Sequence, residues 1–293
     1  MREFIKNWVL PPGVSRTMGL LLLSLRGKPP EERARLEENR VILAKNEALR
    51  DRHKGQRCFI LGAGSSIKKQ DLKKLKGETV ISVSNTFVHP DYPLFRPRYH
   101  VLPSIFGHTM HSTDKFVKWL KEMEQKTFDA EMFFHYGDKG PIETHGLFRN
   151  RTVHWIEYCA WDGSPNTPLD LSNVPTIWSV SELAITAALF MGFEKIYLLG
   201  MDHDWFNGPL VYFYDEKKEH AMKPDKESLA FADSEFQMRR HADIFKKYKY
   251  LYGLKKNIYN ANADPNTYLD VFPRVSYDSL FPAKRRREST GEV

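Results

Sequence analysis

The stretch SVSELAITAALFMGFEKIYLLGMD, residues 179–202, decides the fold class of this chain. Ser179 and Glu182 have the spacing of a capping box, in which each side chain bonds the backbone at the start of a helix. The apolar residues that follow predict a helix over 179–191. The run at 195–200 does not alternate between polar and apolar residues, so it predicts a strand buried on both faces of a parallel sheet. A helix followed by such a strand is typical of α/β proteins.

The same alternation of strands and helices extends in both directions from this stretch. We therefore predict an α/β fold, a Rossmann-like and mostly parallel sheet with helices on both faces (a GT-A-like variant), plus an N-terminal helical extension. The predicted strands cover 57–62, 79–84, 131–135, 152–156, 195–200 and 256–260, and the predicted helices lie near 66–76, 114–126, 179–191 and 234–252.

Composition excludes several classes of protein. The 293 residues are 41% hydrophobic and 28% charged, which is typical of a globular chain and not of a disordered or collagenous one. Two cysteines, Cys58 and Cys159, are too few for a disulfide framework, which favours a reducing cytoplasm. The longest apolar run covers residues 18–25, far below the ~20 residues that span a bilayer. We expect no membrane span.

The net charge of +7 is concentrated at the two ends of the chain. Residues 1–57 hold 13 Lys and Arg against 7 Asp and Glu, and residues 284–287 read KRRR. Within 1–26, Trp8 and a run of leucines alternate with basic residues, a composition typical of interfacial helices. An ordinary helix that packs on its own domain is the alternative. We predict contact with an anionic membrane surface, no nucleic-acid partner, and a cytoplasmic location, peripheral on the inner face of the cell membrane.

A glycine-containing turn follows the first predicted strand. Such a turn before a helix can present backbone N–H groups to a phosphate, or it can need glycine for its geometry alone. It lacks the third glycine of a dinucleotide fingerprint and the Gly-Lys-Ser/Thr of a P-loop. Asn85, at the end of the next strand, adds an amide that could contact a base or ribose. The residues of the turn are Gly62, Ala63, Gly64, Ser65 and Ser66.

A second polar cluster follows the strand at 195–200. Asp202 and Asp204 flank His203, so they could hold Mg²⁺ or Mn²⁺ on a diphosphate, bind ribose hydroxyls without metal, or cap a turn. Tyr212 and Tyr214 lie on the same side of an extended segment, where their hydroxyls could bind a departing phosphate. Packing in the core is the alternative for both tyrosines.

These segments follow the order seen in bacterial sialyltransferases of glycosyltransferase family 42, which the chain resembles. It looks still closer to the motility-associated and hydroxymethylpterin-diphosphokinase-like group related to them. The resemblance covers roughly 56–281. It is carried by Gly62–Ser66, Ser84–Asn85, Ser179–Gly192, Lys195–Asp202, Asn257–Ala261 and Val271–Val275.

The resemblance implies a single Rossmann-like domain that binds a cytidine nucleotide sugar. It directs the glycine turn and Asn85 toward the nucleotide, and Asp202 toward the nucleotide or the acceptor. We also predict that Ser179 binds the nucleotide. Tyr212 is similar in place to a tyrosine that contacts the leaving phosphate in that family, and Tyr214 is its neighbour. The sequence departs from the family at 231–235, where a catalytic histidine is expected and the chain reads FADSE.

We predict a glycosyltransferase of bacterial surface-polysaccharide or glycoconjugate assembly. It would transfer a sugar, sialic-acid-like or Kdo-like, from a CMP-activated nucleotide donor to a glycan or lipid-linked acceptor. Candidates for the catalytic base are Asp202, His203, Asp204 and His241. No cofactor is required in this interpretation, and Mg²⁺ or Mn²⁺ at Asp202 and Asp204 is the alternative.

Two other functions stay open at this point. One is a pterin diphosphokinase-like transferase that uses ATP and magnesium, and the other is a non-catalytic nucleotide-binding protein docked to a membrane. The predicted organisation is a basic amphipathic helical extension over 1–55, a Rossmann-like nucleotide-sugar-binding catalytic domain over 56–282, and a basic disordered tail over 283–293.

Overall fold

The computed structural model divides into two compact units, Met1–Ile42 and Leu43–Val293. It describes residues 39–105, 112–161, 163–203, 211–215, 234–265, 267 and 269–281. The smaller unit is described only at 39–42, which are helical. The predicted membrane-contacting segment and the basic tail lie outside the described residues. Among the helices of the described ranges, none is both long enough and apolar enough to cross a bilayer.

The larger unit is built on a seven-stranded sheet in which every pair of neighbours is parallel. The sheet order is β5-β4-β3-β2-β1-β8-β9. This confirms the predicted α/β fold, with a sheet that is entirely and not only mostly parallel. The strands are β1 (Arg57–Leu61), β2 (Val80–Val83), β3 (Tyr99–Val101), β4 (Glu131–His135), β5 (Val153–Ile156), β8 (Lys195–Leu199) and β9 (Ile258–Asn260).

The direction of sheet growth reverses once, between β1 and β8. From β1 the chain builds outward through β2, β3, β4 and β5, then returns to the other side of β1 and adds β8 and β9. In open parallel sheets, ligands bind at the carboxyl ends of the strands beside such a reversal. The ends of β1 and β8 are therefore the place to look for a site.

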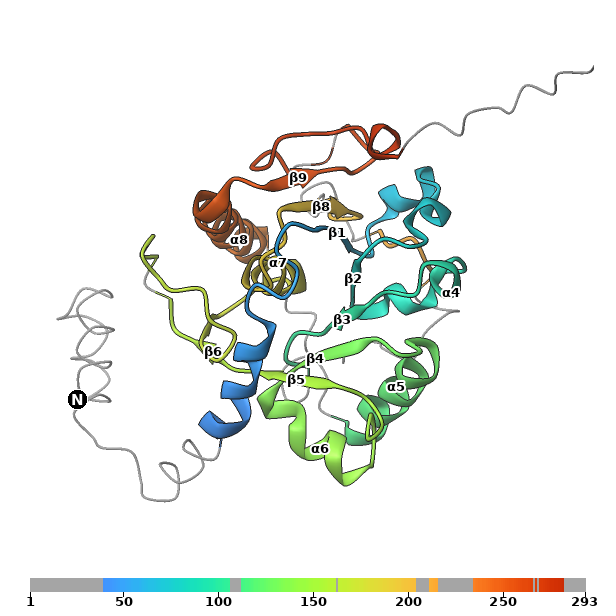
Figure 1. Ribbon diagram of the computed structural model, residues 1–293, viewed down its shortest axis with the longest axis vertical. Helices are drawn as coiled ribbons and strands as arrows, with labels where there is room; N and C mark the ends of the chain where they lie inside the picture. The colour runs from blue at the N-terminus through green and yellow to red at the C-terminus, as the bar shows by residue number, and fades with distance from the viewer. Residues whose placement is uncertain are drawn as a thin grey trace, which may run out of the picture. The chain divides into compact units, whose positions relative to one another are not determined.

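Helices cover both faces of the sheet because alternate strand residues point to opposite faces. Cys58 and Ile60 belong to the core beneath α7 (Val180–Phe190) and α8 (Ser234–Lys255). Phe59 and Leu61 belong to the core beneath the other helices: η2 (Ser65–Lys69), η3 (Leu72–Leu75), α4 (Tyr92–Phe95), α5 (Thr113–Lys126) and α6 (Lys139–Thr144). Figure 1 shows α7 and α8 on one side of the sheet and α4 and α5 on the other.

The helix predicted near 66–76 is not one continuous helix, because that segment forms two short 3-10 helices, η2 and η3. Asp71 separates them, and its carboxylate accepts a hydrogen bond from the Lys73 N–H at 3.2 Å, which starts a new turn. The predictions also missed β3, whose three residues are too few to show a period. The remaining elements are η1 (Lys45–Leu49), η4 (Ser84–Val88), η5 (Tyr136–Asp138), η8 (Asp278–Leu280), and the paired strands β6 (Tyr158–Cys159) and β7 (Val174–Pro175).

Residues 43–55, which the sequence analysis placed in the N-terminal extension, pack against the sheet of the larger unit. Leu49 is buried in the core beneath α7. His53 stacks on Phe193, with ring centroids 4.4 Å apart, and its Nε2 lies 2.7 Å from the Tyr99 hydroxyl oxygen. The larger unit therefore contains the second half of the predicted helical segment.

Candidate functional site

A cavity of about 590 Å³ lies at the carboxyl ends of β1, β2 and β8, beside the reversal in the sheet. Two groups of residues line most of it. The glycine wall consists of Gly62, Ala63, Gly64, Ser84, Asn85, Asp202, Tyr212 and Tyr214. The helix wall consists of Thr176, Ile177, Trp178, Ser179, Val180, Ser181 and Arg240.

The structure gathers most of the predicted site residues at this cavity. Ser65, Ser66 and His241 lie beside the cavity and are not among the described residues that line it. Asp204 lies outside the described residues. The predicted residues in the lining are Gly62, Ala63, Gly64, Asn85, Ser179, Asp202, His203, Tyr212 and Tyr214.

Both glycines of the turn are required by the close approach of two backbone segments. The Gly62 N–H donates to the Leu199 carbonyl at 2.7 Å, and the Gly64 N–H donates to the Gly200 carbonyl at 2.8 Å. A Cβ on Gly62 would lie 2.4 Å from the Gly200 carbonyl oxygen. These contacts favour the geometric explanation of the glycines, because their N–H groups are already bonded within the protein.

Asp202 ties the end of β8 to the glycine turn. Its Oδ2 accepts the Ser66 N–H at 2.9 Å, and the Ser66 hydroxyl donates to its Oδ1. The chain before it is held by Asn262, whose side chain accepts the Met201 N–H at 3.1 Å and donates to the Met201 carbonyl at 3.0 Å. Asp202 thus has a structural role in addition to its place in the cavity lining.

His203 lines the cavity, and its ring contacts the hydroxyl of Tyr248. The distance from His203 Nε2 to the Tyr248 hydroxyl oxygen is 2.8 Å, and the rings of His203 and His241 are nearly perpendicular with centroids 6.2 Å apart. Burial lowers the pKa of His203 to about 3 and that of His241 to about 4, and the charge of Arg240 adds to both shifts. Both imidazoles are therefore neutral at physiological pH.

The alternative of Mg²⁺ or Mn²⁺ bound at Asp202 and Asp204 finds few carboxylate ligands among the described residues. Asp202 is the only one of its two predicted ligands placed there, and its oxygens already accept hydrogen bonds from Ser66. No group of three or more His, Cys, Asp or Glu side chains suited to a metal ion occurs among the described residues.

The two tyrosines stack on each other at the glycine wall. The rings of Tyr212 and Tyr214 are parallel to within 2°, with centroids 5.0 Å apart. The Asn85 amide donates to the Tyr214 hydroxyl at 3.1 Å and accepts the Trp119 indole N–H at 2.8 Å. Because both ends of the Asn85 amide are occupied, Asn85 orients Tyr214 in this structure.

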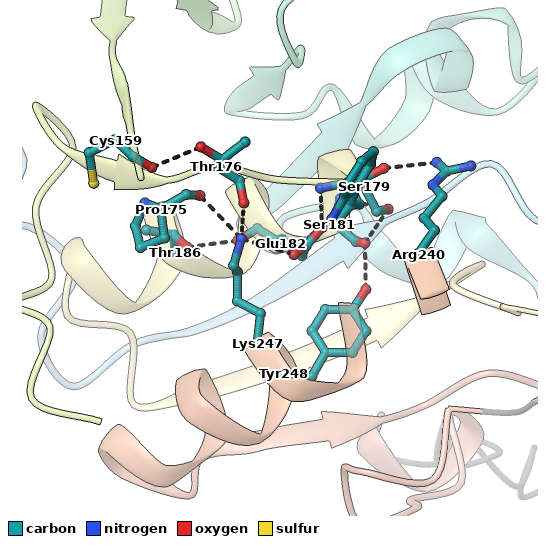
Figure 2. A network of polar contacts seen from close by, with 11 residues as sticks. Cys159, Pro175, Thr176, Ser179, Ser181, Glu182, Thr186, Arg240, Lys247 and Tyr248 are labelled. Atoms are coloured by element: carbon teal, nitrogen blue, oxygen red, sulfur yellow. Dashed lines mark hydrogen bonds and ion pairs between the residues drawn. The ribbon is translucent and has the colours of Figure 1, made fainter. Parts of the chain in front are cut away.

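The helix wall is held by buried charges (Figure 2). The predicted capping box of Ser179 and Glu182 is confirmed, and Glu182 Oε2 also accepts the Trp178 N–H at 2.8 Å. Lys247 Nζ lies 3.3 Å from Glu182 Oε1 and donates to the carbonyls of Pro175 and Thr176. Burial raises the pKa of Glu182 and lowers that of Lys247, and their mutual attraction opposes both shifts.

Arg240 is a cavity residue that the sequence analysis did not single out. Its Nη2 donates to the Trp178 carbonyl at 2.8 Å, and the side chain lines the cavity. Burial lowers its pKa to about 10, so the guanidinium stays charged at neutral pH. The sequence carries one signal that could have identified Arg240. It lies seven residues before Lys247, so both basic side chains share one face of α8. Both contact the segment before α7.

No protein-family model matches the chain, and no curated protein matches its sequence. Among solved structures, the chain is similar to the sialyltransferase CstII from Campylobacter jejuni, determined in complex with the substrate analogue cytidine-5'-monophosphate. The sequences are 15% identical, the match covers 76% of this chain and 85% of that chain, and the TM-score is 0.36. This likeness bears on no individual residue of the cavity.

Proposed function

We propose that the protein is a glycosyltransferase that binds a CMP-activated sugar in this cavity and transfers the sugar to a glycan acceptor. One observation carries the proposal: the cavity beside the sheet reversal combines stacked tyrosines with a half-buried guanidinium. Its volume of about 590 Å³ lies within the range of small-molecule sites. The cytidine nucleotide and the sugar class come from the motif resemblance to family 42.

The cavity offers groups for both sides of the transfer. When the bond between the anomeric carbon and the phosphate oxygen breaks, CMP leaves with the electron pair. The Arg240 guanidinium and the hydroxyls of Tyr212 and Tyr214 would stabilise the charge on the departing phosphate. On the other side, the acceptor oxygen bonds the anomeric carbon and loses its proton to a base. The configuration at that carbon is inverted.

His203 is the base that we favour among the four candidates. It lines the cavity, whereas His241 is not among the lining residues, and both Asp202 oxygens already accept hydrogen bonds from Ser66. The pKa of His203, about 3, is low for a base, and a bound phosphate would raise it because a nearby negative charge favours the imidazolium. Tyr248 would act as a positioning residue that orients the ring.

Titration calorimetry of the full chain with CMP, UDP and ATP tests the nucleotide class. We expect CMP to bind, and Arg240→Met to weaken its affinity by about ten- to a hundredfold, because a charged hydrogen bond to phosphate is worth about 1.5–3 kcal/mol. Arg239→Met is the matched control, since Arg239 is exposed and pairs with Glu235. Binding of ATP in place of CMP would support the diphosphokinase alternative, and absence of all binding would refute a nucleotide site.

Release of CMP from a CMP-sugar donor tests the chemistry and the need for metal. We expect Asp202→Asn to lower turnover, because it weakens the contact that fixes the glycine turn beside the donor. Turnover that persists in a chelator supports the metal-free transfer proposed here. Turnover that is lost and then restored by Mg²⁺ or Mn²⁺ supports the alternative at Asp202 and Asp204. A folded Asp202→Asn variant with normal turnover would remove Asp202 from the active centre.

A further inference from the structure

Trp178, on the helix wall of the cavity, is unusually exposed for a tryptophan. It is 43% exposed, and its indole N–H makes no hydrogen bond to any described residue. Tryptophan is usually well buried because its large ring gains much from leaving water. An exposed indole in the lining of a cavity therefore indicates a contact with a ligand.

The backbone of Trp178 is fixed by hydrogen bonds at both its N–H group and its carbonyl. Glu182 accepts the Trp178 N–H at 2.8 Å, and Arg240 donates to the Trp178 carbonyl at 2.8 Å. The indole also meets the ring of Phe236 edge-on, at 85° with centroids 5.7 Å apart. Because Lys247 holds Glu182 in turn, the segment that carries the ring is fixed before any ligand arrives.

The groups around Trp178 suit a sugar. A pyranose has an apolar face of C–H groups, which packs on an aromatic ring, and a rim of hydroxyls, which need hydrogen-bonding partners. The indole N–H, the Ser179 hydroxyl and Arg240 supply polar groups beside the ring. A nucleotide base lacks such a rim of hydroxyls, and in the proposed function the departing phosphate lies against Arg240, Tyr212 and Tyr214.

We propose that Trp178 is the stacking platform for a pyranose ring of the acceptor glycan. The proposal rests on the proposed glycosyl transfer, which needs a second sugar beside the donor. In this arrangement the donor would occupy the interior of the cavity between the two walls, and the acceptor would approach from solvent, where Trp178 is 43% exposed. The exposed ring of Trp178 is the part of the helix wall that meets it.

The test is ¹⁹F NMR on the full chain labelled with 5-fluorotryptophan. The Trp178 resonance is assigned by its absence in Trp178→Phe, and the Trp161 resonance in the same way. Trp161 is the matched control, because its indole N–H donates to the Thr167 hydroxyl and its ring packs on Tyr250, outside the cavity lining. Lactose, N-acetylglucosamine and methyl mannoside are titrated in the millimolar range with CMP present, and CMP binding is measured separately by calorimetry.

We expect at least one sugar to shift the Trp178 resonance and leave the Trp161 resonance in place. Trp178→Ala should weaken binding of that sugar about fivefold, because an aromatic contact is worth about 1 kcal/mol, and should change CMP affinity far less than Arg240→Met does. Trp178→Phe should keep part of the binding.

Three outcomes would overturn the proposal. The first is CMP binding with no effect of any sugar on Trp178. The second is a shift of Trp178 on adding CMP alone, which would assign the ring to the nucleotide. The third is no binding of either CMP or sugar, which would remove the proposed function as well. A sugar-induced shift without CMP binding would instead support the platform and refute the CMP donor.

Discussion

The two walls of the cavity hold their shape by different physical means. The glycine wall depends on backbone contact, because Gly62 and Gly64 bond the end of β8 directly and leave no room for a Cβ. The helix wall depends on buried charge, because Glu182 and Lys247 bond the backbone before α7. Substitutions that add side-chain volume should therefore destabilise the glycine wall, and substitutions that remove a charge should destabilise the helix wall.

Removing one charge from the helix wall should give the largest effect. Lys247 and Glu182 have side chains that are 5% and 0% exposed, so Lys247→Met leaves a buried carboxylate without its cation. We expect the free energy of unfolding to fall by about 3–5 kcal/mol. Urea denaturation followed by circular dichroism measures this loss.

A second variant separates the lost charge from the lost side chain. In Lys247→Met combined with Glu182→Gln, no buried carboxylate remains, and the amide oxygen can still accept a backbone N–H. The double variant should therefore be more stable than Lys247→Met alone. If the double variant is the less stable of the two, the wall is held by packing and not by the ion pair.

Adding a single methyl group to the glycine wall should have the next largest effect. In Gly62→Ala the new Cβ would meet the backbone carbonyl of Gly200, which cannot turn away as a flexible side chain could. We expect a loss of about 1–3 kcal/mol in the free energy of unfolding. Gly140→Ala in α6 is the matched control, because nothing lies within 4 Å of its Cβ position. Equal stability of the two variants would contradict the close approach.

The two walls also differ in how much of them the sequence predicts. Ser179 and Glu182 are three residues apart, so the start of α7 follows from local spacing, and the turn at Gly62–Ser66 follows from two glycines after an apolar strand. Lys247 is 65 residues from Glu182, and only the folded chain brings them together. The use of the glycine N–H groups also depends on β8, which is distant in sequence.

The roles of individual side chains were the least predictable part. Asn85 was expected to face a nucleotide, and its amide is occupied by Trp119 and Tyr214. In the sequence, Arg240 is one of several basic residues on a predicted helix. Its contact with the Trp178 carbonyl is formed only in the folded chain. Residue type and spacing indicate which groups a site contains, whereas their partners depend on tertiary packing.

His203 joins the two walls, and its titration should give the smallest of the three effects. It follows Asp202 of the glycine wall, and its partner Tyr248 hydrogen-bonds Ser181 of the helix wall. Burial holds its pKa at about 3 in the folded chain, below the value near 6.5 of an unfolded histidine. As the pH falls below about 6.5, the unfolded state binds a proton that the folded state does not, so stability is lost toward lower pH.

Because of His203, the free energy of unfolding should fall by about 1 kcal/mol for each pH unit between about pH 6 and 4. Other buried histidines also make the free energy of unfolding fall toward lower pH. The contribution of His203 is therefore measured as the difference in this pH dependence between two variants. His203→Asn removes the titration and suits the backbone, because His203 has φ +50° and asparagine tolerates that conformation. Urea denaturation at several pH values should show a shallower dependence in His203→Asn than in His145→Asn, which alters an exposed histidine outside the cavity lining. Equal pH dependence of the two variants would mean that His203 binds a proton as readily in the folded chain as in the unfolded chain. The assignment of a neutral His203 ring between the two walls would then be wrong.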